Sequence, residues 1–327
     1  MRLRRSPLLA LLPLLGLVAA GCSDGSTGEP AGEGLRVVAT TSILGDLVGD
    51  LVGEDGEVQV LMGPGVDPHA FAPSAAQAAD VRDADLVVAN GLGLEESLVD
   101  LLEAAEADGA EVVELAPQLD PIAFEDHAEE GHAEEGDGEA EDDHGHEEGG
   151  ADPHVWFDPV RMADGVAIVA ARLAEVDDAL PDEEWEERGA ELAANLLALD
   201  EELRTILEDI PAERRVLVTN HEAIGYLAAR YDLEIVDSVI PGGGTLASAD
   251  AGRLAGLVDV IRERDLPAIF AENTTDDRLA RSLAREVGRD VEVVTLYTDA
   301  LGEAGSGAET YADLLRTDAR LIADALG

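Results

Sequence analysis

The sequence predicts an α/β protein of two lobes, each a mainly parallel four-stranded sheet flanked by helices, with a long rigid helix joining them. Eight short runs rich in β-branched residues alternate with amphipathic stretches at helical spacing, which is the pattern of βαβ units. Four of these runs lie on each side of a long helical segment. Residues 35–327 provide about 290 residues, enough for two lobes that each bury a core.

The first lobe is expected to span residues 35–180. Its predicted strands are 35–39, 57–62, 86–89 and 111–115, and its predicted helices are 43–52, 75–84, 95–107 and 159–176. Because each strand is followed by a helical stretch, the strands are expected to run parallel.

A connecting helix is predicted over residues 181–210, where apolar residues recur at helical spacing at Leu192, Leu196, Leu199, Leu203 and Ile206. Pro181 suits its first turn and Pro211 ends it. The second lobe then spans 211–327, with strands at 215–219, 233–237, 268–271 and 291–296 and helices at 246–264 and 277–287.

The amino terminus is predicted to be an export signal. Basic residues open the chain, and the apolar run from Pro7 to Ala20 is too short for a membrane span. Small residues precede Cys22, the only cysteine, which resembles a bacterial lipobox. Residues 1–22 are therefore expected to be a lipoprotein signal peptide, Cys22 the lipidated residue that anchors the protein to the membrane, and 23–34 a flexible tether. An ordinary secretory signal with a chance cysteine is the alternative.

The charge of the chain is strongly negative. It has 72 acidic and 21 basic residues, a formal net charge of -51, and every basic residue is arginine. Contacts to phosphates require a basic surface, so nucleic acid is excluded as a partner. Such a composition says little about the fold.

Residues 125–150 are expected to be a solvated, disordered loop. Thirteen acidic residues and four histidines lie between Glu125 and Glu148, without a basic residue or an apolar side chain larger than alanine. The histidines are His127, His132, His144 and His146. The loop is either an inert charged segment or an auxiliary, weak metal-collecting loop that raises the local cation concentration.

Three of the seven histidines lie outside this loop, namely His69, His154 and His221. His69 and His154 each end an Asp-Pro-His segment, in which proline restricts the preceding backbone, and His221 directly follows a predicted strand. A single histidine is more often a packed core residue than a ligand. Three imidazoles with one carboxylate, however, suit Zn²⁺ and its four tetrahedral ligands.

The fourth ligand is left open by the residues alone. In open α/β sheets ligands bind beyond the carboxyl ends of strands, and both Glu272 and Asp299 occupy such positions. Asp299, Glu272 and water each remain possible as the fourth ligand, and Glu272 could instead orient an imidazole.

Several motifs together resemble the zinc and manganese solute-binding proteins of ABC importers, the ZnuA/TroA-like family, over essentially all of residues 35–327. The motifs are Val38–Val48, Gly65–His69, Asn90–Glu95, Asp152–Pro159, Thr219–Tyr226 and Leu296–Gly302 continuing to Thr310-Tyr311. The resemblance implies two α/β lobes with the metal between them, bound by His69, His154, His221 and Asp299. In the family a histidine at the third position goes with zinc and a glutamate with manganese, so His221 favours zinc over manganese.

The resemblance also implies a binding protein and not an enzyme, with an ABC permease and its ATPase as partners, and a monomer is expected. One departure from the family is Pro241-Gly-Gly-Gly-Thr245, which is interpreted as a flexible surface loop that could alter docking to the permease. A zinc hydrolase is excluded because the His-Glu-x-x-His motif beginning at His221 would need a histidine at Gly225. A cell-adhesion or zinc-buffering surface lipoprotein remains an alternative.

Overall fold

The computed structural model describes residues 34–124, 150–247, 249 and 251–327. These residues form two four-stranded parallel sheets, each flanked by helices, which confirms the predicted fold class. Both sheets have the same topology, because the first and second strands of each lobe are neighbours and the third and fourth follow on the other side of the first.

The first sheet has the order β2-β1-β3-β4, with β1 at Leu35–Thr41, β2 at Gly56–Met62, β3 at Leu86–Ala89 and β4 at Glu111–Glu114. Alternate residues of β1 enter different cores. Val37 and Ala39 pack with helices α1 (Ser42–Val52) and α4 (Pro159–Val176), whereas Val38 packs with α2 (Ala75–Arg82) and α3 (Val99–Asp108). Because both faces of the sheet are buried at its centre, the central strands β1 and β3 carry apolar residues at successive positions.

The second sheet has the order β6-β5-β7-β8, with β5 at Val216–Thr219, β6 at Glu234–Ser238, β7 at Ala268–Glu272 and β8 at Glu292–Leu296. On β5, Leu217 faces the core that contains helices α6 (Gly225–Tyr231) and α9 (Tyr311–Leu326). Its neighbour Val218 faces α7 (Ala251–Glu263) and α8 (Arg278–Val287).

Helix α5 (Asp182–Glu208) is 27 residues long and joins the two sheets, as the leucine spacing predicts. Pro181 caps the helix from outside with an extended backbone, and helical geometry starts at the next residue. Helix α4 packs along α5, so the connection is a pair of helices and not a single rod.

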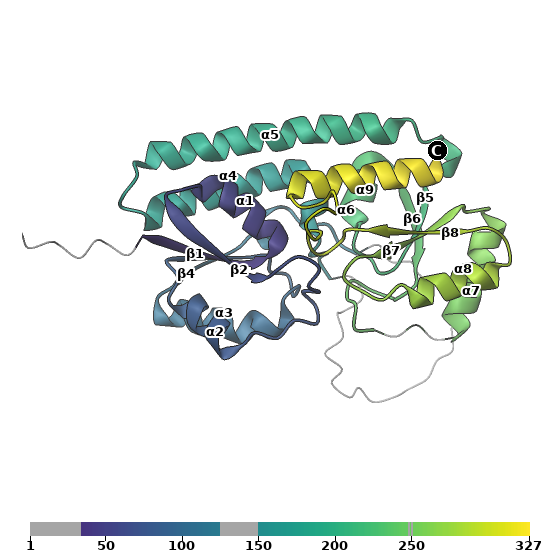
Figure 1. Ribbon diagram of the computed structural model, residues 1–327, viewed down its shortest axis with the longest axis horizontal. Helices are drawn as coiled ribbons and strands as arrows, with labels where there is room; N and C mark the ends of the chain where they lie inside the picture. The colour runs from purple at the N-terminus through teal and green to yellow at the C-terminus, as the bar shows by residue number, and fades with distance from the viewer. Residues whose placement is uncertain (1–33, 125–149, 248, 250) are drawn as a thin grey trace, which may run out of the picture. The chain divides into compact units, whose positions relative to one another are not determined.

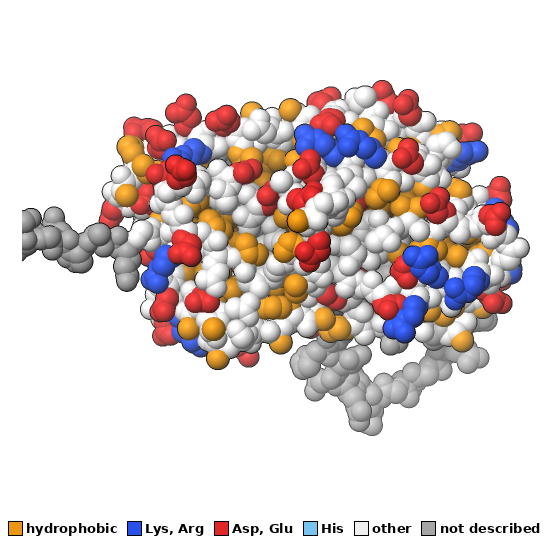
Figure 2. All heavy atoms as spheres, in the orientation of Figure 1, with side chains coloured by type: hydrophobic (Ala, Val, Ile, Leu, Met, Phe, Trp, Pro, Cys, Tyr) orange, Lys and Arg blue, Asp and Glu red, His pale blue; other side chains and the backbone are white. Residues whose placement is uncertain are grey.

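Two helices, α6 and α9, are absent from the elements predicted above. Helix α9 begins at the side chain of Thr310, which accepts a hydrogen bond from the Asp313 N–H (3.1 Å). It packs against α5 and α1 as well as against β8, so the end of the chain contacts elements of the first lobe. Arg316 and Arg320 of α9 form ion pairs with Glu202 of α5. Figure 2 shows basic side chains gathered on the surface where these two helices lie.

The predictions for residues 1–33, including the signal peptide and Cys22, lie outside the described residues. The predictions for the histidines of the loop, His127, His132, His144 and His146, also lie outside them. Within the part of the chain that the structure describes, no helix is long and apolar enough to cross a membrane.

Candidate metal site

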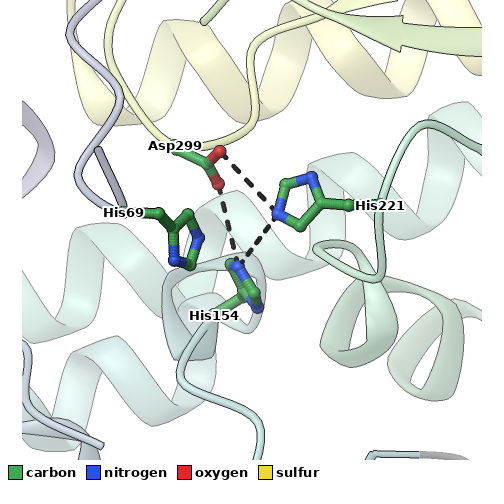
Figure 3. A group of neighbouring side chains, drawn as sticks. All are labelled: His69, His154, His221 and Asp299. Atoms are coloured by element: carbon green, nitrogen blue, oxygen red, sulfur yellow. Dashed lines mark hydrogen bonds and ion pairs between the residues drawn. The ribbon is translucent and has the colours of Figure 1, made fainter. Parts of the chain in front are cut away.

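The side chains of His69, His154, His221 and Asp299 come together in the structure (Figure 3). Each offers one nitrogen or oxygen atom, and these four atoms all lie within 4.8 Å of one another. All four residues are buried, with between 0% and 6% of their surface exposed. The structure thus brings the three predicted histidines and the preferred carboxylate into one group.

Loops at the carboxyl ends of strands carry three of these residues. His69 lies in the loop after β2, His221 comes two residues after β5, and Asp299 comes three residues after β8. His154 instead directly precedes a short 3-10 helix, η3 (Val155–Phe157). Four segments far apart in the sequence therefore meet at one point.

The two Asp-Pro-His segments form the same local turn. Asp67 Oδ1 accepts a hydrogen bond from the His69 N–H (2.9 Å), and Asp152 Oδ1 accepts one from the His154 N–H (2.9 Å). The intervening proline has no N–H and a fixed φ, so it lies in the turn without losing a hydrogen bond. This turn holds the backbone of each histidine relative to its own aspartate.

Carboxylates also orient two of the imidazoles. The Nδ1 atom of His154 lies 2.7 Å from Asp152 Oδ1, and that of His221 lies 2.5 Å from Glu272 Oε1. When Nδ1 carries the proton that a carboxylate accepts, Nε2 keeps its lone pair for a metal ion.

The two Nε2 atoms lie 3.3 Å apart, and they lie 3.9 Å and 3.8 Å from the two oxygens of Asp299. In a tetrahedron with zinc–ligand bonds of about 2.0–2.1 Å, the ligand atoms are about 3.3–3.4 Å apart. The spacing between His154 and His221 therefore matches zinc, and a small movement of Asp299 would complete the tetrahedron.

Glu272 lies behind His221 and outside the group of four. Its Oε1 accepts a hydrogen bond from the backbone N–H of His221 (3.0 Å), and its Oε2 accepts one from the Asn220 side chain (3.1 Å). With both oxygens engaged in this way, the geometry favours the orienting role over the role of fourth ligand.

Asp299 has the fewest hydrogen bonds of the carboxylates here. Its Oδ2 accepts a long hydrogen bond from Thr274 Oγ1 (3.4 Å), and among the described residues nothing donates to its buried Oδ1. A buried carboxylate oxygen without a donor is costly unless a cation compensates it. This observation favours a bound cation beside Asp299.

Burial dominates the pKa values at the site. Burial raises the pKa of Asp299 to about 7, with the charges of Glu272 and Asp67 adding to the effect and that of His221 opposing it. Burial lowers the pKa of His221, but the carboxylates of Glu272 and Asp299 outweigh it and raise this pKa to about 9. In the metal-free site His221 therefore keeps a second proton at neutral pH, which a metal ion must displace.

Asp152 is a functional residue that the sequence analysis did not single out. Asp152 is 2% exposed, burial raises the pKa of its carboxyl group to about 7, and it contacts both the backbone and the ring of His154. A Cβ atom at Gly225 would lie 2.8 Å from Asp152 Oδ2, so the absence of a side chain at 225 makes room for this carboxylate. The repeated Asp-Pro-His spacing was the available signal.

The glycine segment after Ile240 differs from the expected surface loop. Thr245 Oγ1 donates to Asp67 Oδ2 (2.6 Å), and a Cβ atom at the buried Gly243 would lie 2.0 Å from the ring of Phe124. Glycine is required here because the aromatic ring of the first lobe contacts the backbone of the second. The segment thus bridges the lobes beside His69.

Comparison with known proteins places the chain among metal-binding proteins. The family model described as zinc-uptake complex component A, periplasmic, matches residues 37–325. The manganese-binding lipoprotein MntA of Halalkalibacterium halodurans is 31% identical over 94% of this chain and 93% of its own length. The zinc-binding protein TroA of Treponema pallidum is 29% identical over 98% of this chain and 99% of its own length.

Other comparisons extend the range of metals and include solved structures. The iron-binding protein YfeA of Yersinia pestis is 26% identical over 99% of this chain and 97% of its own. The solved structure of the periplasmic zinc-binding protein TroA from Treponema pallidum superposes with a TM-score of 0.78, at 29% identity, over 90% of this chain and 99% of that one.

Proposed function

Because this chain belongs to the ZnuA family of metal-binding, extracytoplasmic components of ABC importers, we propose that it captures Zn²⁺ between its two lobes. The family consists of solute-binding proteins, so the chain is a metal-binding subunit of an importer and not an enzyme. Its partners are accordingly an ABC permease and the ATPase of that permease.

The group formed by His69, His154, His221 and Asp299 supports zinc as the metal. Three imidazoles and one carboxylate supply four ligands, which is the number that Zn²⁺ binds in its usual tetrahedral geometry. Mn²⁺ prefers oxygen ligands and more of them. The relative named for manganese at 31% identity makes manganese the second candidate, with His221 as the residue that distinguishes the two.

Competition titration on metal-free protein (residues 35–327) tests the choice of metal. Wild type is expected to bind Zn²⁺ more tightly than Mn²⁺, and His221→Glu is expected to narrow that preference. Tighter binding of Mn²⁺ than of Zn²⁺ by the wild type would contradict the proposal.

The same titration tests the ligands. Asp299→Ala is expected to weaken Zn²⁺ binding because it removes a ligand. Glu272→Ala is expected to weaken it about 10–100-fold, the effect typical of a residue that orients a ligand. Glu234→Gln is the control, because Glu234 is an exposed residue of β6 whose side chain pairs with Arg264 (2.6 Å).

We further propose that Cys22 carries the lipid that holds a monomeric protein at the membrane surface. Several relatives are named lipoproteins. Mass spectrometry of the membrane fraction is expected to find acyl chains on Cys22, and Cys22→Ser should release the protein. Retention of Cys22→Ser in the membrane would contradict this proposal.

For the acidic segment we propose weak metal collection by His127, His132, His144 and His146. Deletion of residues 126–148 is expected to slow Zn²⁺ uptake at scarce zinc and to leave the affinity of the main site unchanged. Unchanged Zn²⁺ uptake by the deletion variant would contradict this proposal and favour the interpretation of the segment as an inert charged loop.

A further inference from the structure

The loop that carries Asp299 belongs to the second lobe in sequence but is hydrogen-bonded to both lobes. It follows β8 and continues to Gly302. On the side of the second lobe, the Asn273 side chain accepts from the Thr298 N–H (3.2 Å) and donates to the Ala300 carbonyl (3.1 Å).

Three further hydrogen bonds fix the same loop to the first lobe. The indole Nε1–H of Trp156 donates to the Thr298 carbonyl (2.8 Å), and Ser42 Oγ accepts from the Leu301 N–H (3.0 Å). The Gly65 N–H donates to the Leu301 carbonyl (3.1 Å). The backbone on both sides of Asp299 is therefore held by residues of the opposite lobe.

Trp156 makes the bond nearest to the ligand. The Thr298 carbonyl belongs to the peptide unit that ends at the nitrogen of Asp299, so its orientation sets the direction in which the Asp299 side chain leaves the backbone. Both groups of this hydrogen bond are buried, with Trp156 3% and Thr298 2% exposed. A buried carbonyl that loses its donor is costly, so this hydrogen bond constrains the Thr298 peptide strongly.

Trp156 also contacts the other side of the site. Its ring packs edge-on against the ring of His154, with centroids 5.3 Å apart, and its carbonyl accepts a hydrogen bond from Tyr311 Oη (2.6 Å). One rigid side chain therefore touches one ligand and holds the backbone of another.

Among the described residues, Asp299 accepts one long hydrogen bond, from Thr274, and lies 3.8–3.9 Å from two imidazole nitrogens, so its own contacts hold its side chain weakly. We propose that Trp156 is a positioning residue for the metal site, which sets the Asp299 carboxylate for the ion through the Thr298 carbonyl, with Ser42 supporting the same loop. This inference rests on the proposed function of the four-ligand site.

The test uses the two tryptophans of the chain as a matched pair. Trp156→Phe removes the indole N–H and keeps an aromatic ring beside His154. Trp185→Phe is the control, because the indole of Trp185 is also buried and donates to a carboxylate, Asp177 Oδ2 (3.1 Å), away from the four ligands. Zn²⁺ affinity is measured by chelator competition, and the melting temperature of each metal-free variant is measured in parallel.

Trp156→Phe is expected to weaken Zn²⁺ binding about tenfold, the effect of one lost hydrogen bond, whereas Trp185→Phe should stay within about twofold of wild type. In an Asp299→Ala background, Trp156→Phe should weaken Zn²⁺ binding further by less than about twofold, because the residue through which Trp156 acts is absent. Ser42→Ala should also weaken Zn²⁺ binding, because it removes the hydrogen bond to the Leu301 N–H of the same loop.

An equal weakening by Trp156→Phe with and without Asp299 would overturn the inference, as would an equal weakening by Trp185→Phe. If Trp156→Phe destabilises the fold more than Trp185→Phe, replacement of Trp156 by 3-benzothienylalanine repeats the test, because sulfur replaces the N–H at nearly unchanged shape. If Asp299→Ala weakens Zn²⁺ binding and neither Trp156 variant does, only this inference fails. If Asp299→Ala leaves the affinity unchanged, the four-ligand site fails as well.

Discussion

At the scale of single residues, the site is built from histidines that each have a carboxylate of their own. Asp152 contacts the ring of His154 and Glu272 contacts the ring of His221, while Asp67 holds the backbone of His69. Asp152 and Glu272 are buried and Asp67 is partly buried, so water screens their interaction with the site less than it would at the surface. They favour a cation among the four ligands more strongly than Asp299 could alone.

Proton competition follows from the same charges. With a pKa of about 9 for His221 and of about 7 for Asp299, both groups bind a proton in the metal-free protein below pH 7, and His221 keeps its proton up to about pH 9. A metal ion displaces these protons, so its affinity is expected to rise with pH. Between pH 7 and 9 the rise should approach about tenfold per pH unit, as for the loss of one proton.

Zinc titrations between pH 6 and 9 measure this slope, and calorimetry in buffers of different ionisation enthalpy counts the protons released. An affinity that stays constant from pH 7 to 9 would show that His221 is already neutral before the metal binds.

At the scale of elements, the glycine segment connects the second lobe to the turn of His69 through the hydrogen bond between Thr245 and Asp67. Thr245→Val removes this bond at nearly constant size. We expect Zn²⁺ to dissociate about tenfold faster, since the loss of a hydrogen bond worth about 1.5 kcal/mol corresponds to about tenfold.

Stopped-flow release of Zn²⁺ to a chelator measures this dissociation rate. Thr205→Val is the control, because the hydroxyl of Thr205 bonds only the backbone of its own helix, at Glu201 (3.0 Å). Equal rates in the wild type and Thr245→Val would contradict the bridging role of the segment.

Helix α9 contains a carboxyl group that is costly to bury. Asp318 is 0% exposed, its Oδ1 accepts from the Tyr297 N–H (3.0 Å), and among the described residues nothing bonds its Oδ2. Burial raises its pKa well above the ordinary value of 3.8. The folded protein therefore holds this proton more tightly than the unfolded chain, and the stability from this group is lost as the pH rises above about 4.

Asp318→Asn removes the titration and keeps the acceptor for Tyr297. The variant is expected to melt at a higher temperature than the wild type at pH 8, and the difference should be smaller at pH 5. Each kcal/mol gained in the free energy of unfolding should raise the melting temperature by about 2–4 °C. Asp324→Asn, at an exposed position of the same helix, should have no such effect. A lower melting temperature for Asp318→Asn at pH 8 would contradict the cost assigned to the carboxyl group.

At the scale of the whole molecule, a metal ion bound by the four residues would join the two lobes and should stabilise the folded state. Saturation with Zn²⁺ at about 1,000 times its dissociation constant is expected to add about 4 kcal/mol. Differential scanning calorimetry with and without a chelator measures this gain. The His221→Ala variant should lose most of it, and an equal gain in that variant would show that Zn²⁺ stabilises the protein from another site.

The strands and the three histidines could be predicted because each has a local signal. The β-branched runs mark all eight strands to within two residues at each end, and the scarcity of histidine singles out His69, His154 and His221. The repeated Asp-Pro-His segment was a local signal for Asp152 that the sequence analysis did not use. The contact of Trp156 with Thr298 spans 142 residues and could not be predicted, because it has no local signal. Helix α6 is short, and α9 packs on elements far away in the sequence, so neither was recognised.

The position of α9 has a consequence for how the protein reaches its working compartment. Its first residue bonds Asp46 across 265 residues (2.8 Å), and the Asp299 loop just before it bonds Ser42 across 259 residues. Pairings of such high sequence separation form late in folding. A chain that is exported from its amino terminus passes residues 297–326 through the translocation channel after Ser42 and Asp46, their partners in the first lobe. A site that needs both segments is therefore completed only after both have crossed, so a chain still in transit cannot fold around a cytoplasmic ion.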